Sequence, residues 1–187
     1  MRNWFVITGG PSAGKTTLIE ALEACGLHVE HESARIVIDE GIAAGKTIEQ
    51  IRADEGAFQD IVYKHKVERE KRLDPDEPTF FDRGMQDTFA YLTLHGLPIS
   101  PHLEEEMLAA TYRKVFLLEP FGYKRDYART ESLEEQDQLF HLLHDVYIRS
   151  GVTVEIIPAF PTKEERITYF LSYLAEKDQV NIPQRNS

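Results

Sequence analysis

The residues best suited to chemistry form a glycine-rich turn near the start of the chain. Gly9, Gly14, Lys15 and Thr16 match the phosphate-binding pattern G-x-x-x-x-G-K-[ST]. Glycines let successive backbone N–H groups curl around an anion, and the following helix N-terminus adds further donors. We expect Lys15 to contact the β- and γ-phosphates of a nucleoside triphosphate, and the Thr16 hydroxyl to bind Mg²⁺. The predicted nucleotide-binding residues are Gly9, Gly10, Pro11, Ser12, Ala13, Gly14, Lys15, Thr16 and Thr17.

A second group of polar residues follows the apolar run 79–82. Asp82 ends this run, and open α/β sheets place their ligands at the carboxyl ends of strands. Its carboxylate can hold Mg²⁺, directly or through water, as a Walker-B acid does. Arg83 comes next and can clamp a phosphate or an acceptor group with paired N–H groups. The structural alternative is an aspartate that caps the next turn beside a surface arginine.

Glu32 and Arg35 follow another short alternating segment, on the same predicted rim of the sheet. Glu32 can orient or deprotonate an acceptor hydroxyl, and Arg35 can bind the anionic part of an acceptor. A plain surface ion pair is the alternative for these two residues.

The polar, basic segment at about 119–133 has no repeating apolar pattern and contains Lys124, Arg125 and Arg129. Phosphoryl transfer needs positive charge at the transition state and exclusion of water, which an arginine-bearing lid supplies. We therefore predict a lid here, with an exposed basic loop as the alternative. The other strongly charged stretch, 64–72, is interpreted as the solvated face of a helix.

Strand and helix patterns alternate along the chain, which is typical of a parallel sheet flanked by helices. We predict strands at about 3–8, 27–32, 79–82, 114–118 and 152–158. Predicted helices cover about 15–25, 47–73, 86–95, a segment from 100, 132–150 and 162–176, whereas 33–38 leads into a glycine-containing loop. The pattern predicts one domain over 1–176 and a polar tail at 177–187.

The composition restricts the class of protein. A chain of 187 residues suits one domain, and its net charge of −11 argues against nucleic acid as the main partner. No apolar run approaches the roughly 20 residues of a membrane span, and the N-terminus lacks a signal-peptide pattern. With the single Cys25 there is no disulfide framework, so we expect a cytoplasmic protein.

These motifs together resemble the small P-loop proteins grouped as AAA-like ATPases with the NadR-type kinase domain. The resemblance rests on residues 8–17, 32–35, 81–84 and 129–132. It implies an α/β fold like that of nucleoside and nucleotide kinases, with a five-stranded parallel sheet of order 2-3-1-4-5 and helices on both faces. The Asp-Arg-Gly at 82–84 is also similar to the Asp-Arg of thymidylate kinases, in which both residues touch the acceptor nucleotide.

The resemblance also implies roles for individual residues. It makes Lys15 and Thr16 the phosphate and Mg²⁺ contacts and Asp82 the Walker-B-like acid. It places Arg125 and Arg129 in the lid and turns Glu32 and Arg35 toward the acceptor, with Arg83 beside them. The acceptor-side residues match no single kinase closely enough to transfer its substrate.

The sequence therefore predicts an ATP- and Mg²⁺-dependent phosphotransferase acting on a small molecule, such as a nucleoside, a nucleotide or nicotinamide riboside. The catalytic residues would be Lys15, Glu32, Asp82, Arg125 and Arg129. The alternative is a nucleotide-binding ATPase or GTPase regulator that acts through a protein or lipid partner. The absence of a clear Asn/Thr-Lys-x-Asp motif weakens a GTP switch, because the nearest Lys-x-Asp, at 124–126, follows Tyr123.

Overall fold

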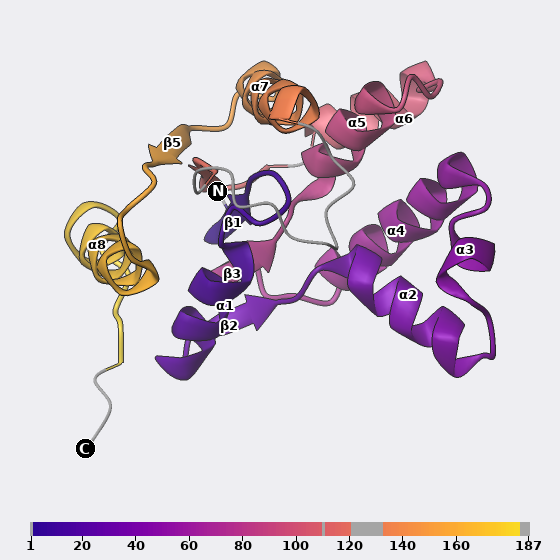
Figure 1. Ribbon diagram of the computed structural model, residues 1–187. Helices are drawn as coiled ribbons and strands as arrows, with labels where there is room; N and C mark the ends of the chain where they lie inside the picture. Colours follow the sequence, from indigo (N-terminus) through magenta and orange to yellow (C-terminus); the bar gives the residue numbers. More distant parts are fainter. Residues whose placement is uncertain (1, 110, 121–132, 184–187) are drawn as a thin grey trace.

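The computed structural model describes residues 2–109, 111–120 and 133–183, and its centre is a parallel β-sheet (Figure 1). The strands are β1 (Trp4–Thr8), β2 (His28–Glu30), β3 (Thr79–Asp82), β4 (Lys114–Leu118) and β5 (Val154–Ile157). They pair in the order β2-β3-β1-β4-β5, and every pair is parallel. Both the parallel sheet expected from the alternating pattern and the strand order expected from the resemblance are confirmed.

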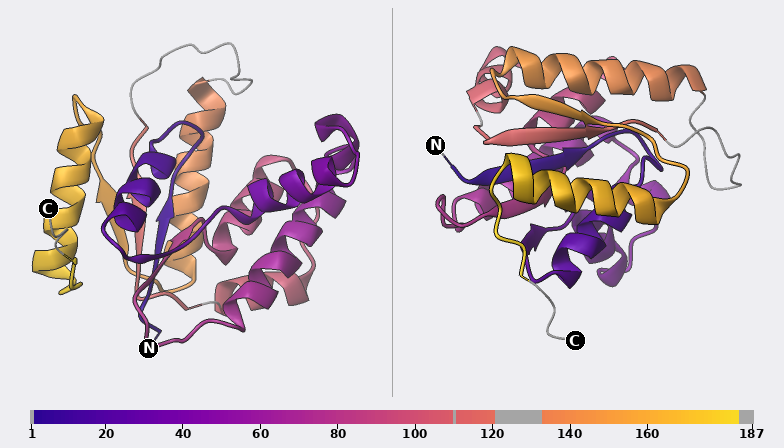
Figure 2. Two further views of the ribbon diagram at one scale, coloured as in Figure 1. Left: turned by 90° about the horizontal axis from the view of Figure 1, so that it is seen from below. Right: turned by 90° about the vertical axis from the view of Figure 1, so that its left-hand side faces the viewer.

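Helices cover both faces of the sheet because the central strands are apolar on both sides. Successive side chains of a strand point to opposite faces, so β1 sends Val6 toward one layer and Phe5 toward the other. Phe5 packs with α1 (Lys15–Ala24) and α8 (Lys163–Lys177), and Val6 packs with the layer that contains α7 (Leu133–Arg149). The right-hand view of Figure 2 shows α7 and α8 on opposite sides of the strands.

The remaining helices lie between the strands in sequence. They are α2 (Ser33–Ala43), α3 (Ile48–Ile51), α4 (Glu55–Glu70), α5 (Met85–Leu94) and α6 (Pro101–Ala109). Residues of α4, α5, α6 and α7 share one hydrophobic core with the sheet. A smaller apolar cluster, Val37, Phe58 and Val62, joins α2 to α4. Figure 1 shows α2, α3 and α4 together on one side of α5 and α6.

Two local predictions need correction. The residues from Ser33 onward, predicted to lead into a loop, form α2, whose N-cap residue, Glu32, makes no side-chain cap hydrogen bond. Its stability comes from tertiary packing, because Val37 is buried against the cluster with Phe58. Ser33 is a residue type favoured at helix N-caps, but it occupies the first helical position here, and no side chain caps the helix.

The helix predicted from residue 47 is divided into two. The Thr47–Gln50 capping box is present, since the Thr47 Oγ1 accepts from the Gln50 N–H and the Gln50 side chain accepts from the Thr47 N–H. The helix nevertheless ends at Ile51, and α4 begins anew after Asp54, whose carboxylate accepts from the Ala57 N–H. A second N-cap within the segment therefore causes the break.

Arg166 connects α8 to the edge of the sheet that carries the glycine-rich loop. Its side chain is 1% exposed, and Nη1 donates to the carbonyl of Ala13 over 2.6 Å. Nη2 donates to two further carbonyls, that of Glu119, which directly follows β4, and that of Ile157, the last residue of β5. The residues after α8 also pack on the rest of the protein, because Asp178 pairs with Lys114 and Val180 is buried.

Within the described part of the chain, no helix is both long and apolar enough to span a membrane.

Candidate active site

The glycine-rich loop joins β1 to α1 and has the backbone conformation that its sequence requires. Gly9 and Gly14 have φ angles of 149° and 87°, and a Cβ at Gly9 would come within 3.0 Å of the Leu118 carbonyl oxygen. The Lys15 side chain is 7% exposed, and its Nζ donates to the carbonyls of Gly9 and Gly10 over 3.1 and 2.9 Å. Burial, assisted by the charge of Arg83, lowers the pKa of Lys15 to about 8.

Asp82 lies at the carboxyl end of β3, beside Ile7 of β1 in the sheet register. The carboxyl group is buried, and its Oδ1 has no hydrogen-bond partner among the described residues. Burial raises the pKa of Asp82, and the nearby charge of Glu32 raises it further. Thr16, at the start of α1, is exposed.

The Thr16 hydroxyl and the Asp82 carboxylate are oxygen donors of the kind that a magnesium site uses. Mg²⁺ prefers oxygen donors and retains several waters, so few protein ligands suffice. A buried carboxylate oxygen without a donor calls for an explanation, and a metal-bound water would satisfy Asp82 in this way. Among the residues described, no cluster of three or more His, Cys, Asp or Glu side chains offers a different metal site. Thr16 and Asp82 are therefore the residues that would hold the ion.

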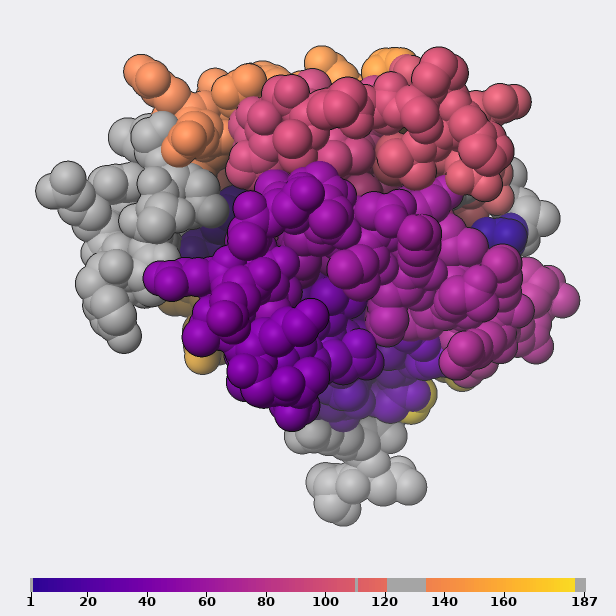
Figure 3. All heavy atoms as spheres, turned by 90° about the vertical axis from the view of Figure 1, so that its right-hand side faces the viewer, coloured from indigo at the N-terminus to yellow at the C-terminus, as the bar shows by residue number. Residues whose placement is uncertain are grey.

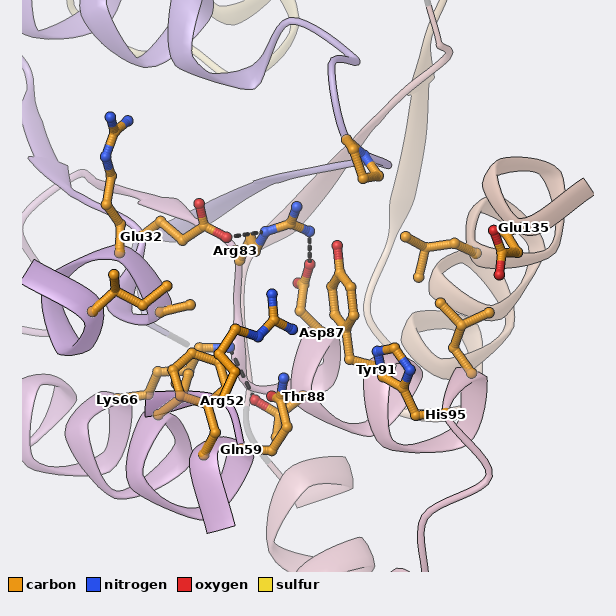
Figure 4. A pocket seen from close by; sticks show the side chains of 18 of the residues that line it. Glu32, Arg52, Gln59, Lys66, Arg83, Asp87, Thr88, Tyr91, His95 and Glu135 are labelled. Carbon is orange, nitrogen blue, oxygen red and sulfur yellow. Dashed lines mark hydrogen bonds and ion pairs between the residues drawn. The ribbon is translucent and has the colours of Figure 1, made fainter. Parts of the chain in front are cut away.

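Arg83 links the loop to the neighbouring helices. Its backbone φ is 70°, an unusual value for a residue with a Cβ, and its side chain is buried. Nε donates to Glu32 over 2.6 Å, and Nη1 donates to the Gly9 carbonyl over 3.2 Å and to Asp87 over 3.1 Å (Figure 4). One guanidinium group thus joins β3, the start of α2, the loop and α5.

Asp87 is a site residue that the sequence analysis missed. It is 1% exposed, and its Oδ1 accepts from the Thr8 hydroxyl over 2.6 Å as well as from Arg83. Oδ2 accepts from the Tyr147 hydroxyl over 2.6 Å and from the Gly84 N–H over 3.0 Å. Burial alone would raise the pKa of Asp87, but the charges of Arg83 and Lys66 outweigh it and lower the pKa. Its position three residues after Gly84, at a helix start, is the capping signal that could have identified it.

Glu32 lies at the N-cap of α2, where it pairs with Arg83. Burial opposes ionisation of this carboxyl, but the charges of Arg83 and Lys15 outweigh burial and lower its pKa. An ionised carboxylate with a lowered pKa is a weak base and a good hydrogen-bond acceptor. Of the two roles expected for Glu32, the lowered pKa is consistent with orienting a hydroxyl and less so with deprotonating it.

A cavity of about 690 Å³ lies between α2–α4 on one side and α5 and α7 on the other, with Pro11 of the loop in its wall. Figure 3 shows the face of the molecule on which α2, α3 and α4 lie beside α5 and α6. Glu32, Arg35, Arg83 and Asp87 line the cavity. A cavity of this volume matches those that hold small molecules in proteins.

The prediction that the charged stretch 64–72 is a solvated helix face is wrong for Lys66, which is buried. Lys64 and Lys71 are exposed and pair with Asp60 and Glu68, but Lys66 is 4% exposed and lines the cavity. Its Nζ donates to the Gly84 carbonyl over 2.6 Å and to the Thr88 hydroxyl over 3.1 Å. Burial lowers the pKa of Lys66 to about 8.

A periodic signal for Lys66 was available in the sequence. Phe58, Val62 and Lys66 are spaced four residues apart, which places all three on one face of α4. Since Phe58 and Val62 are buried, the lysine at the next position of the same face turns inward as well.

The structure brings most of the predicted site residues to one edge of the sheet. Lys15, Asp82 and Arg83 lie at the carboxyl ends of β1 and β3, and Glu32 and Arg35 lie at the start of α2. The predicted lid arginines, Arg125 and Arg129, lie outside the described residues. The lid therefore stays a prediction.

The arrangement resembles known nucleotide-binding folds. In the crystal structure of NadR protein in complex with NR, the matched region covers 98% of this chain and 54% of that one, with a TM-score of 0.70 and 18% identity. For NadR protein in complex with NAD and AMP-PNP, the coverages are 98% and 51%, the TM-score is 0.69 and the identity is 16%. This chain thus spans about half the length of the NadR chains it matches.

Thymidylate kinase from Ehrlichia chaffeensis matches along nearly its whole length. The match covers 91% of this chain and 97% of the kinase, with a TM-score of 0.62 and 12% identity. At these identities the likeness shows the fold alone, and that fold is the one found in P-loop nucleoside and nucleotide kinases. No curated protein sequence matches the chain significantly.

A match to a protein-family model shows which family the chain belongs to. The model, described as an AAA domain, matches residues 4–166 and so includes all five strands and the glycine-rich loop. The chain therefore belongs to this AAA-domain family and is a P-loop NTPase with a nucleoside-kinase-like fold.

Proposed function

We propose that the protein is an ATP- and Mg²⁺-dependent phosphotransferase whose acceptor is a small molecule bound in the 690 Å³ cavity. The observation that carries this proposal is the contact between the cavity and the P-loop. Pro11 of the loop forms part of the cavity wall, and Arg83, in the same wall, donates to the Gly9 carbonyl. An acceptor in the cavity would lie beside the phosphates on the loop, as transfer between two bound substrates requires.

The roles of the loop residues follow from what phosphoryl transfer needs. Its transition state is stabilised mainly by positioning and by positive charge near the phosphoryl oxygens. The P-loop N–H groups and Lys15 would hold the phosphates, and Thr16 with Asp82 would hold Mg²⁺. The ion, when bound, supplies charge that neutralises the phosphate oxygens. Arg125 and Arg129 would add positive charge from the predicted lid.

The acceptor side rests on three residues of the cavity wall. Glu32 would accept a hydrogen bond from the attacking hydroxyl and so fix its direction. Arg83, already held by Glu32 and Asp87, would contact the acceptor with its remaining N–H groups, and Arg35 would contact it from α2. A nucleoside, a nucleotide or nicotinamide riboside is of the right size class. The fold shared with NadR in complex with NR and with thymidylate kinase supports this choice.

The decisive experiment is to measure ADP release from ATP and Mg²⁺, alone and with a panel of nucleosides, nucleoside monophosphates and nicotinamide riboside. We expect one acceptor to stimulate release strongly and to yield a phosphorylated product. The Lys15→Ala variant provides the background rate. Slow release that no acceptor changes would contradict the proposal and favour a nucleotide-dependent regulator, to be pursued through protein or lipid partners.

A further inference from the structure

Two lysines of the chain, Lys15 and Lys66, have the same unusual surroundings. Both side chains are buried, and the Nζ of each donates to backbone carbonyls, of Gly9 and Gly10 in one case and of Gly84 in the other. Burial lowers the pKa of each to about 8. Lys15 is the lysine of a P-loop, where this environment serves to receive a phosphate.

The hydrogen-bond partners of Lys66 differ from those of three less buried lysines. Lys64, Lys71 and Lys114 each pair with a carboxylate. Lys66 has two neutral oxygen partners, Gly84 O and Thr88 Oγ1, and no ion pair with any residue that the structure describes. The charges of Asp87 and Glu32 act on Lys66 without a direct ion pair, and an ammonium can donate three hydrogen bonds. Lys66 therefore has one N–H left to donate, and its side chain is among those that line the cavity (Figure 4).

The wall around Lys66 offers more donors than acceptors to a ligand. Both oxygens of Asp87 are already occupied by donors from the protein. The Nη2 of Arg83 has no acceptor among the described residues, and Arg35 forms no ion pair with them. Besides Asp87, the carboxylates that line the cavity are Glu32, which has one oxygen paired with Arg83, and Glu135, whereas Arg35, Arg52, Lys66 and Arg83 supply donors. Such a wall suits a ligand rich in acceptor oxygens.

We propose that Lys66 is a second anion-binding lysine and that the acceptor carries a phosphate or carboxylate group that contacts it. This inference rests on the proposed function, because it takes the cavity as the acceptor site. The rest of the acceptor has apolar surface to pack on, since Ile38, Phe58, Val62 and Leu94 also line the cavity. A planar ring with an attached oxyanion matches this combination of an apolar patch and a donor cluster.

The test measures binding, so that it does not depend on turnover. The protein is loaded with AMP-PNP and Mg²⁺, and calorimetry gives the Kd of matched neutral and anionic ligands. Adenosine and thymidine are compared with their 5′-monophosphates, which tests phosphate. Nicotinamide riboside is compared with nicotinate riboside, which exchanges a carboxamide for a carboxylate. We expect the anionic member of at least one pair to bind at least tenfold more tightly.

Two variants on the same helix identify the residue responsible. Lys66→Gln removes the charge and keeps N–H donors for the Gly84 carbonyl, whereas Lys64→Gln removes an exposed lysine two residues away. The preference for the anion should disappear in Lys66→Gln and persist in Lys64→Gln. AMP-PNP affinity should be the same in all three proteins, because the P-loop is unchanged.

Equal binding of the neutral and anionic members to the unaltered protein would overturn the proposal, and this comparison needs no variant. A preference that survives in Lys66→Gln would overturn it as well. The outcome is also separable from the proposed function. ADP release stimulated by a neutral acceptor, with no effect of Lys66→Gln on binding, would leave the phosphotransferase standing without the anion site. If the anion preference is lost in Lys66→Gln but no acceptor stimulates ADP release, the anion site stands and the phosphotransferase proposal fails.

Discussion

Lys15 and Arg83 donate hydrogen bonds to the same atom, the carbonyl oxygen of Gly9, over 3.1 and 3.2 Å. Two positive charges thus meet at one oxygen, and the charge of Arg83 helps to lower the pKa of Lys15. The carboxylates of Glu32 and Asp87 compensate by pairing with Arg83. The P-loop and the cavity wall therefore share a hydrogen-bond acceptor.

The first prediction concerns Lys15 itself. Lys15→Ala should lower ATP turnover by roughly 10²-fold or more, because a preorganised charge next to the transferred phosphoryl group is lost. The variant should stay folded, since a buried charge that opposes folding is removed with it. ADP release and circular dichroism measure the two effects, with Lys64→Ala as the exposed control. Unchanged turnover would remove the P-loop from the mechanism.

A second prediction separates the structural and functional roles of Asp82. Its Oδ1 has no partner in the described chain, and burial raises its pKa, so Asp82→Asn should change the free energy of unfolding by less than about 1 kcal/mol. Turnover should nevertheless fall by roughly 10²-fold, and the Mg²⁺ concentration for half-maximal activity should rise. Rates measured across a Mg²⁺ titration test this. A Mg²⁺ dependence equal to that of the unaltered protein would exclude Asp82 as a metal ligand.

Asp87 should behave in the opposite way and matter for stability. Asp87→Asn places an amide N–H₂ where the carboxylate accepts from Arg83, Thr8, Tyr147 and the Gly84 N–H. Breaking such a buried pair costs about 3–5 kcal/mol, which urea unfolding can measure. The matched control is Asp60→Asn, because Asp60 is exposed and forms only a surface pair with Lys64. A loss no larger than that of the control would show that the network is not stabilising.

The fourth prediction is a pH dependence caused by Lys66. Its pKa is about 8 in the folded protein and 10.5 in the reference state, so between these values the unfolded chain binds a proton that the folded chain does not. The free energy of unfolding should therefore rise with pH, by up to about 1.4 kcal/mol per pH unit from this group. Lys15 has the same shift, but it is present in both proteins and cancels in a comparison with Lys66→Gln.

Urea unfolding at pH 7.5, 8.5 and 9.5 provides the measurement. The unaltered protein should gain stability relative to Lys66→Gln as the pH rises through this range. Higher pH values are avoided because the buried hydroxyls of Tyr112 and Tyr147, whose pKa burial raises, would then destabilise both proteins. A difference between the two proteins that does not vary with pH would show that Lys66 is not desolvated.

The parts of the fold that could be predicted from the sequence are those encoded by short local patterns. β1, β3 and β4 are short apolar runs. Gly9 and Gly14 indicate the P-loop, because both adopt positive φ angles that other residues rarely adopt. The positions of Asp82 and Arg83 followed from the same logic, because a residue that ends a parallel strand lies at the ligand edge.

The parts that were missed depend on contacts between distant segments. Whether Lys66 faces solvent is decided by Gly84 and Thr88, which accept its hydrogen bonds from the start of α5. The spacing of Lys66 from Phe58 and Val62 indicates a buried position, but the many charged residues next to it in the sequence favoured an exposed one. α2 was missed for a similar reason, because the packing of Val37 on α4 replaces a capping signal.

The side chain of Arg166 has a consequence for how the protein is made. Its guanidinium group donates to the P-loop carbonyl of Ala13, although the two residues are 153 positions apart in the chain. A ribosome that has released only the first strands has already exposed the complete glycine-rich loop, but not the arginine that anchors it. We therefore expect the nascent chain to acquire its nucleotide-binding conformation late, when α8 has emerged and docked, and not when the loop itself is synthesised.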